Sequence, residues 1–276
     1  MRLAVVGHVE RVWFAEVPRI PAAGEILHAG AAWEEAAGGG GVAAVQLVRM
    51  GAEVDLFTAL GDDEHGASAE RELADRGVRV HAARRPPPQR RAFTLLDAAA
   101  ERTIVVVGER HVPHGDDPLP WDALAGAAGA YFTGGDAGAL RAARAAGVLT
   151  ATVRARGPLA QAGVRLDALV RSAGDPGEAY APGDVVPPPR AVVATAGARG
   201  GSWRREDGSE GTWAPAPLPG PPVDAYGCGD TFAASLLAAL ARGDALEPAL
   251  AFAARQGAAC LTGRGPYGAG LEPLAR

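Results

Sequence analysis

Short apolar segments alternate with helical patterns along much of this chain. One clear unit contains a predicted strand at Val54–Leu60, a predicted helix at Glu64–Arg76 and a second strand at Val78–Ala82. Strands separated by single helices are typical of parallel sheets in which each helix crosses over to the next strand. The same alternation predicts later strands at 130–133, 148–153, 166–171 and 191–195. The sequence therefore predicts an α/β fold with a mostly parallel central sheet flanked by helices.

Two regions interrupt this alternation and contain predicted strands without helices. Val12–Val17 and Ile26–Trp33 are short mixed segments separated by prolines and a glycine. The segment 91–107 has two apolar runs around a polar turn, which predicts a hairpin. We expect these strands to form a small β lid from about 12–33 and 91–107, within a single domain spanning 1–276.

The composition excludes several classes of function. The chain has 276 residues and a formal net charge of −5, and it contains neither lysine nor asparagine. A net acidic chain without lysine argues against binding to nucleic acid. A Walker A loop and a lysine Schiff base both need a lysine, so the sequence excludes both.

Cysteine usage and hydropathy bear on the compartment. Cys228 and Cys260 provide no disulfide framework, as expected in a reducing cytosol. No apolar run reaches the ~18–20 residues of a membrane span, and the first residues lead into a strand without a signal-peptide pattern. We therefore expect a cytoplasmic protein that does not bind membranes. The six histidines show no zinc-ligand spacing, so we expect them to be ordinary surface residues.

The stretch Val223–Phe232 carries the strongest chemical signal. A proline-rich run precedes it, and an apolar, alanine-rich helix is predicted from Gly229 to Ala241. The glycines on either side of Cys228 let backbone N–H groups turn toward one point, where the helix dipole favours an anion. Asp230 lies in the first turn beside that point, as suits a base for an alcohol that attacks a phosphoryl group. Alternatively, the glycines only shape the helix start and Asp230 caps it.

The string D-A-Y-G-C-G-D-T-F at 224–232 closely resembles the D-T-x-G-A-G-D-[TS]-F signature of the ribokinase-like (PfkB) carbohydrate kinases. The resemblance covers nearly the whole chain. It implies a three-layer fold with a β lid, and ATP-dependent phosphorylation of a hydroxyl group on a sugar or sugar-like small molecule. It implies ATP and Mg²⁺ as cofactors, and many family members also hold a monovalent cation such as K⁺. It makes Asp230 the general base and assigns the anion hole to the N–H groups of Gly227, Cys228 and Gly229.

Four consecutive glycines at 38–41 open a predicted helix and could be only a flexible helix entry. They resemble the family's acceptor-binding segment G-G-x-[GAP]-x-N. The family's asparagine falls on Val42, and its substrate-binding aspartate in the first loop falls on Val12, with Glu10 nearby. Two polar groups for the acceptor are therefore missing at their usual positions. The resemblance places the acceptor beside Gly38, Gly39, Gly40, Glu10 and Asp230.

The segment 195–201 follows a predicted strand and resembles the family's T-x-G-x-x-G segment. In the family, backbone N–H groups and the threonine of this segment meet the nucleotide phosphates. Arg199 adds a positive charge there, or is simply a solvated surface residue. The resemblance assigns nucleotide binding to Thr195, Gly197, Arg199 and Gly200.

Two further segments match positions where the family holds cations. Asp175-Pro176-Gly177-Glu178 resembles the family's N-x-x-E segment, with Asp in place of Asn. The carboxylates of Asp175 and Glu178 would help to hold Mg²⁺ through water, and the alternative is a polar turn. Asp224 and the carbonyl groups near Gly265 match the monovalent cation site. Alternatively, Asp224 hydrogen-bonds its own loop.

Two other functions stay open at this point. An acceptor with fewer hydroxyl groups would suit Val12 and Val42, so a nucleoside kinase is one alternative. A catalytically weak family member that binds a ligand or regulates another process is the second. Lid strands often pair between subunits in this family, so we also expect a homodimer through the lid.

Overall fold

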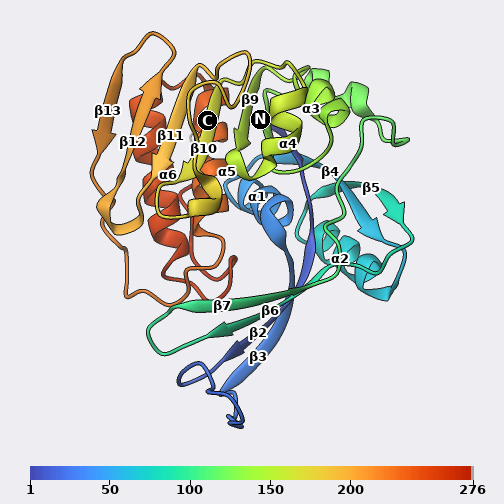
Figure 1. Cartoon of the computed structure of the whole chain (residues 1–276), viewed down its shortest axis with the longest axis vertical. Coiled ribbons are helices and arrows are strands. Elements are labelled where there is room, and N and C mark those ends of the chain that lie inside the picture. Colours follow the sequence, from blue (N-terminus) through green and yellow to red (C-terminus); the bar gives the residue numbers. More distant parts are fainter. Residues whose placement is uncertain (275–276) are drawn as a thin grey trace.

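The computed structural model describes residues 1–274, which form two sheets (Figure 1). The larger sheet has nine strands in the order β13-β12-β11-β10-β9-β8-β1-β4-β5. Its strands are β1 (Arg2–Val6), β4 (Glu53–Gly61), β5 (Arg79–Arg85), β8 (Gly129–Phe132), β9 (Val148–Thr152), β10 (Ala168–Ser172), β11 (Ala191–Thr195), β12 (Gly201–Arg205) and β13 (Glu210–Trp213). Neighbouring strands pair in parallel along the part of the sheet ordered β11-β10-β9-β8-β1-β4-β5. The strands β12 and β13 add an antiparallel edge beside β11. The prediction of a mostly parallel sheet is confirmed.

Helices cover both faces of this sheet, and β1 shows why. Leu3 and Val5 belong to one buried cluster, whereas Ala4 and Val6 belong to a second cluster on the opposite face. Side chains of a strand alternate between faces, so an apolar run without polar interruptions needs cover on both sides. The first cluster includes helices α1 (Gly38–Arg49), α2 (Glu64–Asp75), α5 (Cys228–Arg242) and α6 (Leu246–Cys260), and the second includes α3 (Ala137–Ala143) and α4 (Arg156–Gln161). The three-layer fold is confirmed.

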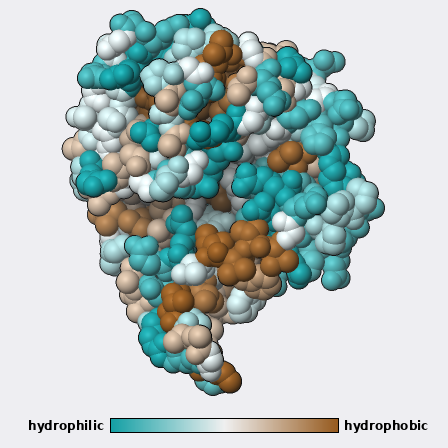
Figure 2. Space-filling model, in the orientation of Figure 1, coloured by the Kyte–Doolittle hydropathy of each residue, from teal (hydrophilic) through white to brown (hydrophobic). Residues whose placement is uncertain are grey.

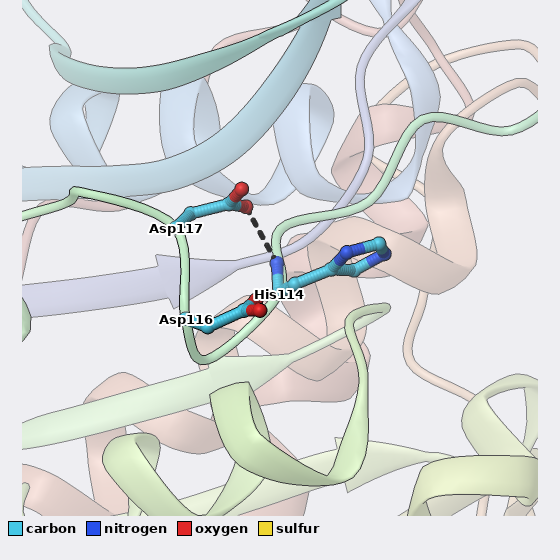
Figure 3. Close-up of side chains that lie close together, drawn as sticks. All are labelled: His114, Asp116 and Asp117. Atoms are coloured by element: carbon cyan, nitrogen blue, oxygen red, sulfur yellow. Dashed lines mark hydrogen bonds between the residues drawn. The ribbon is translucent and has the colours of Figure 1, made fainter.

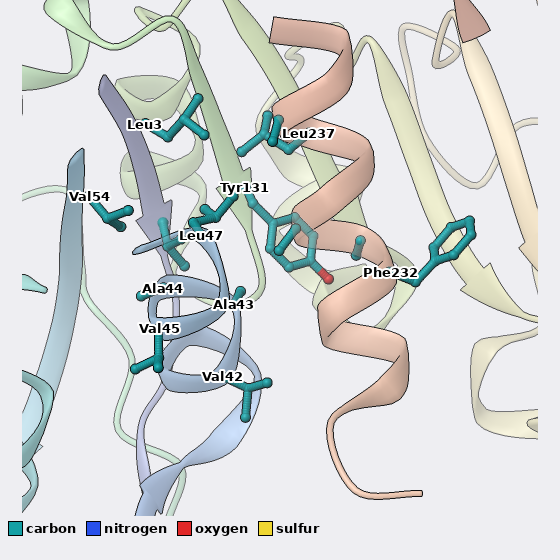
Figure 4. Close-up of a cluster of buried hydrophobic side chains, with 14 of the residues drawn as sticks. Leu3, Val42, Ala43, Ala44, Val45, Leu47, Val54, Tyr131, Phe232 and Leu237 are labelled. Carbon is teal, nitrogen blue, oxygen red and sulfur yellow. The ribbon is translucent and has the colours of Figure 1, made fainter. Parts of the chain in front are cut away.

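The contact between α1 and α5 fixes the two helix starts that matter for function. Figure 4 shows Leu47 of α1 and Leu237 of α5 gathered with Leu3 and Tyr131 of the sheet. All four side chains are at most 2% exposed. Small residues on both helices, such as Ala43, let the backbones approach closely. The amino-terminal ends of α1 and α5 are thereby held beside one edge of the sheet.

The smaller sheet contains β2 (Glu10–Glu16), β3 (Ala31–Ala37), β6 (Arg91–Leu96) and β7 (Arg102–Val107), in the order β3-β2-β6-β7. The hairpin of β6 and β7 matches the prediction. The strand predicted at Ile26–Trp33 is wrong, because pairing with β2 begins only at Ala31. The residues before it form a turn that Glu25 stabilises by accepting the N–H of Ala22, and Ile26 is 86% exposed.

Within residues 1–274, no helix is both long and apolar enough to span a bilayer.

Candidate active site

The candidate site lies at the carboxyl edge of the parallel sheet. His8 follows β1, Thr133 follows β8 and Thr195 ends β11. Glycine-rich starts of α1 and α5 lie at the same edge, because Gly39 and Asp230 approach each other there. Ligands of open α/β sheets bind at this edge, where loops from several strands converge.

The start of α5 requires glycine. Gly227 is the N-cap residue and has a φ of +79°, in the left-handed region that side chains rarely adopt. A Cβ atom at this position would lie 2.9 Å from Cβ of Pro266. A Cβ atom at Gly229 would meet nothing within 4 Å, so the backbone there faces open space. The N–H of Cys228 makes a long bond of 3.5 Å to the carbonyl of Ala225. The first N–H groups of α5 therefore face an accessible site.

Asp230 lies in the first turn of α5 and is half-buried. Burial raises its pKa to about 6, although the charges of Arg102 and Arg154 oppose the shift. The negative charges of Glu178 and Glu10 add to the rise. A carboxylate with a pKa near 6 is mostly ionised at neutral pH and accepts protons more readily than an ordinary aspartate.

The glycines of α1 face this carboxylate. A Cβ atom at Gly39 would lie 3.2 Å from Asp230 Oδ1 and 3.3 Å from His8 Cε1. Gly38 has a φ of +79°, and its Cβ atom would lie 2.9 Å from the backbone nitrogen of Glu10. Gly40 donates its N–H to the His8 carbonyl at 3.0 Å. Gly39 is therefore the residue of this segment that borders Asp230.

His8 is buried rather than on the surface, so the prediction of a surface histidine is wrong for this residue. It is 8% exposed, and its Nε2 accepts the N–H of Gly39 at 3.3 Å. Burial lowers the pKa of His8 to about 3, and Arg110, Arg90 and Arg154 add to the effect. His8 is therefore neutral at physiological pH. His111 is also buried, with its Nε2 2.9 Å from the carbonyl of Pro88.

Glu10, predicted to bind the acceptor, lies beside His8. Its Oε1 is 2.8 Å from Arg90 Nε and 3.7 Å from His8 Nε2. Burial raises the pKa of Glu10, and the charges of Arg90 and Arg110 counteract this. The acceptor side of the site thus combines one carboxylate with two arginines that the sequence prediction did not include.

Val12 and Val42 are both fully buried in the hydrophobic core. Neither position faces the site, so the family's usual acceptor contacts cannot come from them. Thr133 Oγ1 lies 3.5 Å from the Cβ position of Gly39, and it has no hydrogen-bond partner among the described residues. Thr133 and His8 directly follow parallel strands, and this position is the sequence signal that could have identified them.

A cavity of about 490 Å³ lies on the other side of the α5 start. Its walls come from the loop after β11, the segment after β13, and helices α5 and α6. The predicted residues Thr195, Gly197 and Gly200 line it, together with Cys228 and Gly229. The predicted nucleotide and anion segments therefore meet in one cavity.

The rest of the cavity wall is largely apolar, with Trp213, Phe232 and Leu261 among its residues. Such a surface suits a flat heteroaromatic ring. Gly200 requires glycine, because it has a φ of +79° and a Cβ atom would lie 2.0 Å from the carbonyl oxygen of Trp213. Arg199 is exposed on a short turn and does not line the cavity.

Comparison with known proteins decides the family. The sequence pattern of the "pfkB family carbohydrate kinase" matches residues 1–156 and 183–272. The chain belongs to the pfkB family of carbohydrate kinases. Among curated proteins, the bifunctional protein HldE of Methylococcus capsulatus is 41% identical over 88 residues, which span 31% of this chain and 19% of that protein. The match thus covers about a fifth of that relative.

Solved structures of the family share the fold at low sequence identity. A candidate ribokinase from Agrobacterium tumefaciens has a TM-score of 0.81 and 21% identity, covering 98% of this chain and 94% of that chain. Arabidopsis thaliana ribokinase complexed with ribose and ATP has a TM-score of 0.72 and 21% identity, covering 95% and 93%. A nucleoside kinase from Methanocaldococcus jannaschii has a TM-score of 0.73 and 14% identity, covering 99% and 95%.

The residues predicted to hold Mg²⁺ in this pfkB-family chain lie together with an arginine. Asp175 Oδ2 and Glu178 Oε1 lie 2.5 and 2.6 Å from the Arg154 guanidinium. The other oxygen of Asp175 accepts the N–H of Gly177, and the other oxygen of Glu178 accepts the N–H of Ser172. Each of these four carboxylate oxygens therefore already has one partner. Because a carboxylate oxygen has two lone pairs, a water molecule bound to Mg²⁺ fits here only by donating a hydrogen bond to the second lone pair. The magnesium role of both residues stays a prediction.

Asp224 and Gly265, the residues predicted to hold a monovalent cation, are joined directly by a hydrogen bond. Asp224 is fully buried, and its two oxygens accept the N–H groups of Tyr226 at 2.8 Å and Gly265 at 3.0 Å. Asp224 thus joins the α5 loop to the loop around Gly265. The carboxylate stabilises the loop before α5 directly, and the monovalent cation there stays a prediction.

A separate group of potential metal ligands lies on the loop before β8. His114, Asp116 and Asp117 place one ligand atom each within 4.8 Å of one another. Figure 3 shows the backbone N–H of His114 donating to Asp117, while the imidazole ring points away from this bond. Asp117 also forms a two-point ion pair with Arg85, with distances of 2.7 and 2.8 Å. These contacts stabilise the loop and leave little reason to assign a metal.

The lid contacts the α5 loop through Arg102, the first residue of β7. Its guanidinium donates to the carbonyl of Ala225 and lies 5.8 Å from the ring centre of Tyr226. This contact holds the lid hairpin over the start of α5. The outer part of β7 is exposed and apolar, and Figure 2 shows the resulting hydrophobic patch on the face of the molecule that carries the lid.

Proposed function

We propose that this protein transfers the γ-phosphoryl group of ATP to a hydroxyl group of a sugar or sugar-like small molecule. The observation that carries this proposal is the position of Asp230 between two binding spaces. On one side, Cys228 and Gly229 line the 490 Å³ cavity. On the other side, Asp230 faces Gly39 and His8. A base between a nucleotide and an acceptor is placed for phosphoryl transfer to an alcohol.

In this proposal Asp230 takes the proton of the attacking hydroxyl group as the oxygen bonds to phosphorus. The pKa of about 6 keeps the carboxylate ionised at neutral pH while leaving it basic enough to accept a proton. The N–H groups of Gly227, Cys228 and Gly229 stabilise the negative charge on the transferred group. The lid, held by Arg102, limits the access of water that would hydrolyse ATP.

The residues present fit ATP. The apolar wall formed by Trp213 and Phe232 accommodates the adenine ring of ATP, and the turn at 197–200 brings backbone groups toward the phosphates. Mg²⁺, when bound, neutralises charge on the phosphates, and Asp175 and Glu178 are its candidate water-mediated ligands. A K⁺ ion bound beside Asp224 would stabilise the loop whose N–H groups form the proposed anion hole.

A homodimer through the lid accompanies this function. β7 is an edge strand of the lid sheet, and Ile104, Val105, Val106 and Val107 are 40–59% exposed. Unpaired edge strands with apolar side chains favour pairing with another chain. Light scattering at several protein concentrations tests this association.

Release of ADP from ATP and Mg²⁺ tests the function. The panel contains sugars, sugar phosphates, sugar acids, polyols and nucleosides, because a nucleoside kinase is the second candidate. We expect turnover with one acceptor class and its loss in Asp230→Asn. If ATP and a candidate acceptor raise the melting temperature but no member of the panel is phosphorylated, the protein is a binding protein and the kinase proposal is wrong.

A further inference from the structure

The acceptor side of the site contains buried hydrogen-bond donors that the described part of the chain leaves unused. Nε2 of His8 accepts the N–H of Gly39, so in the neutral ring the proton is on Nδ1. His8 Nδ1 is buried and has no partner within residues 1–274. A buried donor without a partner costs ~1–3 kcal/mol, so a ligand oxygen at this point would recover that energy.

Two arginines bring further donors to the neighbourhood of His8 and Glu10. Arg90 directly precedes β6 and Arg110 follows β7, so they lie on the two legs of the lid hairpin. The legs are adjacent, since a Cβ atom at Gly108 would lie 3.6 Å from Arg90 Cα. Arg90 Nε is buried and, although 2.8 Å from Glu10 Oε1, lacks the geometry of a hydrogen bond.

Arg110 has no counter-charge of its own. Throughout the described chain, its guanidinium forms neither a hydrogen bond nor an ion pair. Its charge nevertheless acts on the groups of the site, because after burial it is the largest contribution to the lowered pKa of His8. The side chain of Arg110 is solvent-exposed, although partial burial and the charge of Arg90 lower its pKa. Glu10 pairs with Arg90, so Arg110 is the one of these two arginines that has no ion-pair partner among the described residues.

The chemistry of this group of residues is one-sided. His8 Nδ1, Arg90 and Arg110 are all donors, and an arginine fork matches the oxygens of a phosphate or a carboxylate. An anionic group would give Arg110 an ion-pair partner, whereas a neutral sugar would offer it no opposite charge. We propose that the acceptor carries an anionic group, a phosphate or a carboxylate, that Arg90, Arg110 and His8 bind while another hydroxyl group faces Asp230. This inference rests on the proposed function, because it concerns the acceptor of the same reaction.

Binding measurements on the wild-type protein test the inference without relying on turnover. Isothermal titration compares matched sets: glucose, glucose 6-phosphate and gluconate, and ribose, ribose 5-phosphate and ribonate. We expect at least one anionic member to bind and its neutral counterpart to bind about tenfold or more weakly. The two anionic arms separate a phosphate site from a carboxylate site. Equal binding of the neutral and anionic members, or no binding of any anionic member at millimolar concentration, overturns the inference.

Substitutions then assign the contact. Arg110→Ala should weaken binding of the anionic acceptor about ten- to hundredfold, and Arg110→Lys should recover part of the loss. Arg91→Ala is the matched control, since Arg91 is exposed on the same hairpin one position from Arg90. Equal losses in Arg110→Ala and Arg91→Ala contradict the assignment.

The two proposals fail in different ways. Turnover of a neutral sugar or nucleoside that depends on Asp230 leaves the kinase standing and overturns the anionic acceptor. Binding of a sugar phosphate or sugar acid without ATP binding supports the anion site and contradicts the kinase.

Discussion

Replacement of Asp230 by asparagine should stabilise the fold while abolishing phosphoryl transfer. Burial raises the pKa of Asp230 from 3.8 to about 6. Ionisation of its carboxyl group therefore costs more free energy in the folded protein than in the unfolded chain. This shift corresponds to about 3 kcal/mol, an upper bound because the half-buried side chain retains some contact with water. Asparagine has a similar shape and carries no charge, so the variant avoids this cost.

The pH dependence follows from the same shift. The cost of ionisation is fully present above the folded pKa of about 6 and disappears as the pH falls toward the unfolded value of 3.8. We therefore expect Asp230→Asn to gain up to about 3 kcal/mol over the wild type at pH 7.5, and up to about 1 kcal/mol at pH 4.5. Urea unfolding at the two pH values measures both differences.

Asp63→Asn is a control of opposite sign. Although burial opposes the effect, N–H donors from Gly66 and Gln89 hold the pKa of Asp63 below its usual value. Its carboxylate therefore stabilises the fold at neutral pH, and Asp63→Asn should lower the free energy of unfolding at pH 7.5. If Asp230→Asn is unchanged or less stable than the wild type at pH 7.5, Asp230 does not carry the cost of burial that we assign to it.

Three further variants test other parts of the site. Gly39→Ala places a Cβ atom 3.2 Å from Asp230 Oδ1 and should raise the KM of the acceptor about tenfold, with the KM of ATP unchanged. Gly41→Ala is the control, because its Cβ atom would have no neighbour closer than 3.8 Å. Equal effects of the two variants on the KM of the acceptor would contradict the assignment. In the wild type, kcat/KM should fall about tenfold per pH unit below pH 6. Arg102→Ala should move this acidic decline of kcat/KM to higher pH, because the charge of Arg102 lowers the pKa of Asp230. A shift of the decline to lower pH would refute the electrostatic account. Gly200→Ala, with its positive φ and a carbonyl oxygen of β13 only 2.0 Å from the new Cβ, should cost ~1–3 kcal/mol or more of stability and abolish the rise in melting temperature with ATP; an unchanged rise would exclude this turn from the nucleotide site.

Local sequence patterns were enough to predict most of the architecture. The lid hairpin was predicted within the segment 91–107 that it occupies, because two apolar runs around a polar turn define it locally. The strand near Ile26 was misplaced because its position depends on pairing with β2, which the segment's own composition does not specify. The bounds of such a strand depend on its pairing register with another strand, and not on its own residues.

The two halves of the site differ in how far the sequence could predict them. Asp230 and the turn at 197–200 lie in continuous motifs, so each could be recognised from one segment. His8 lies only two residues before Glu10, but Arg90 and Arg110 come from the two ends of the lid hairpin, and only the folded chain brings them near these residues. Their roles depend on burial and on unpaired donors, neither of which a sequence pattern contains.

The central claim is that Asp230 activates an acceptor hydroxyl group for attack on ATP, and direct detection of the product tests it. Phosphorus NMR of a reaction with ATP, Mg²⁺ and the best-binding acceptor would follow the γ-phosphoryl group over time. We predict a new phosphate monoester signal in the wild type, and its absence in Asp230→Asn although that variant still binds ATP. Formation of the same ester at an equal rate in Asp230→Asn, or appearance of inorganic phosphate alone in the wild type, would contradict the account.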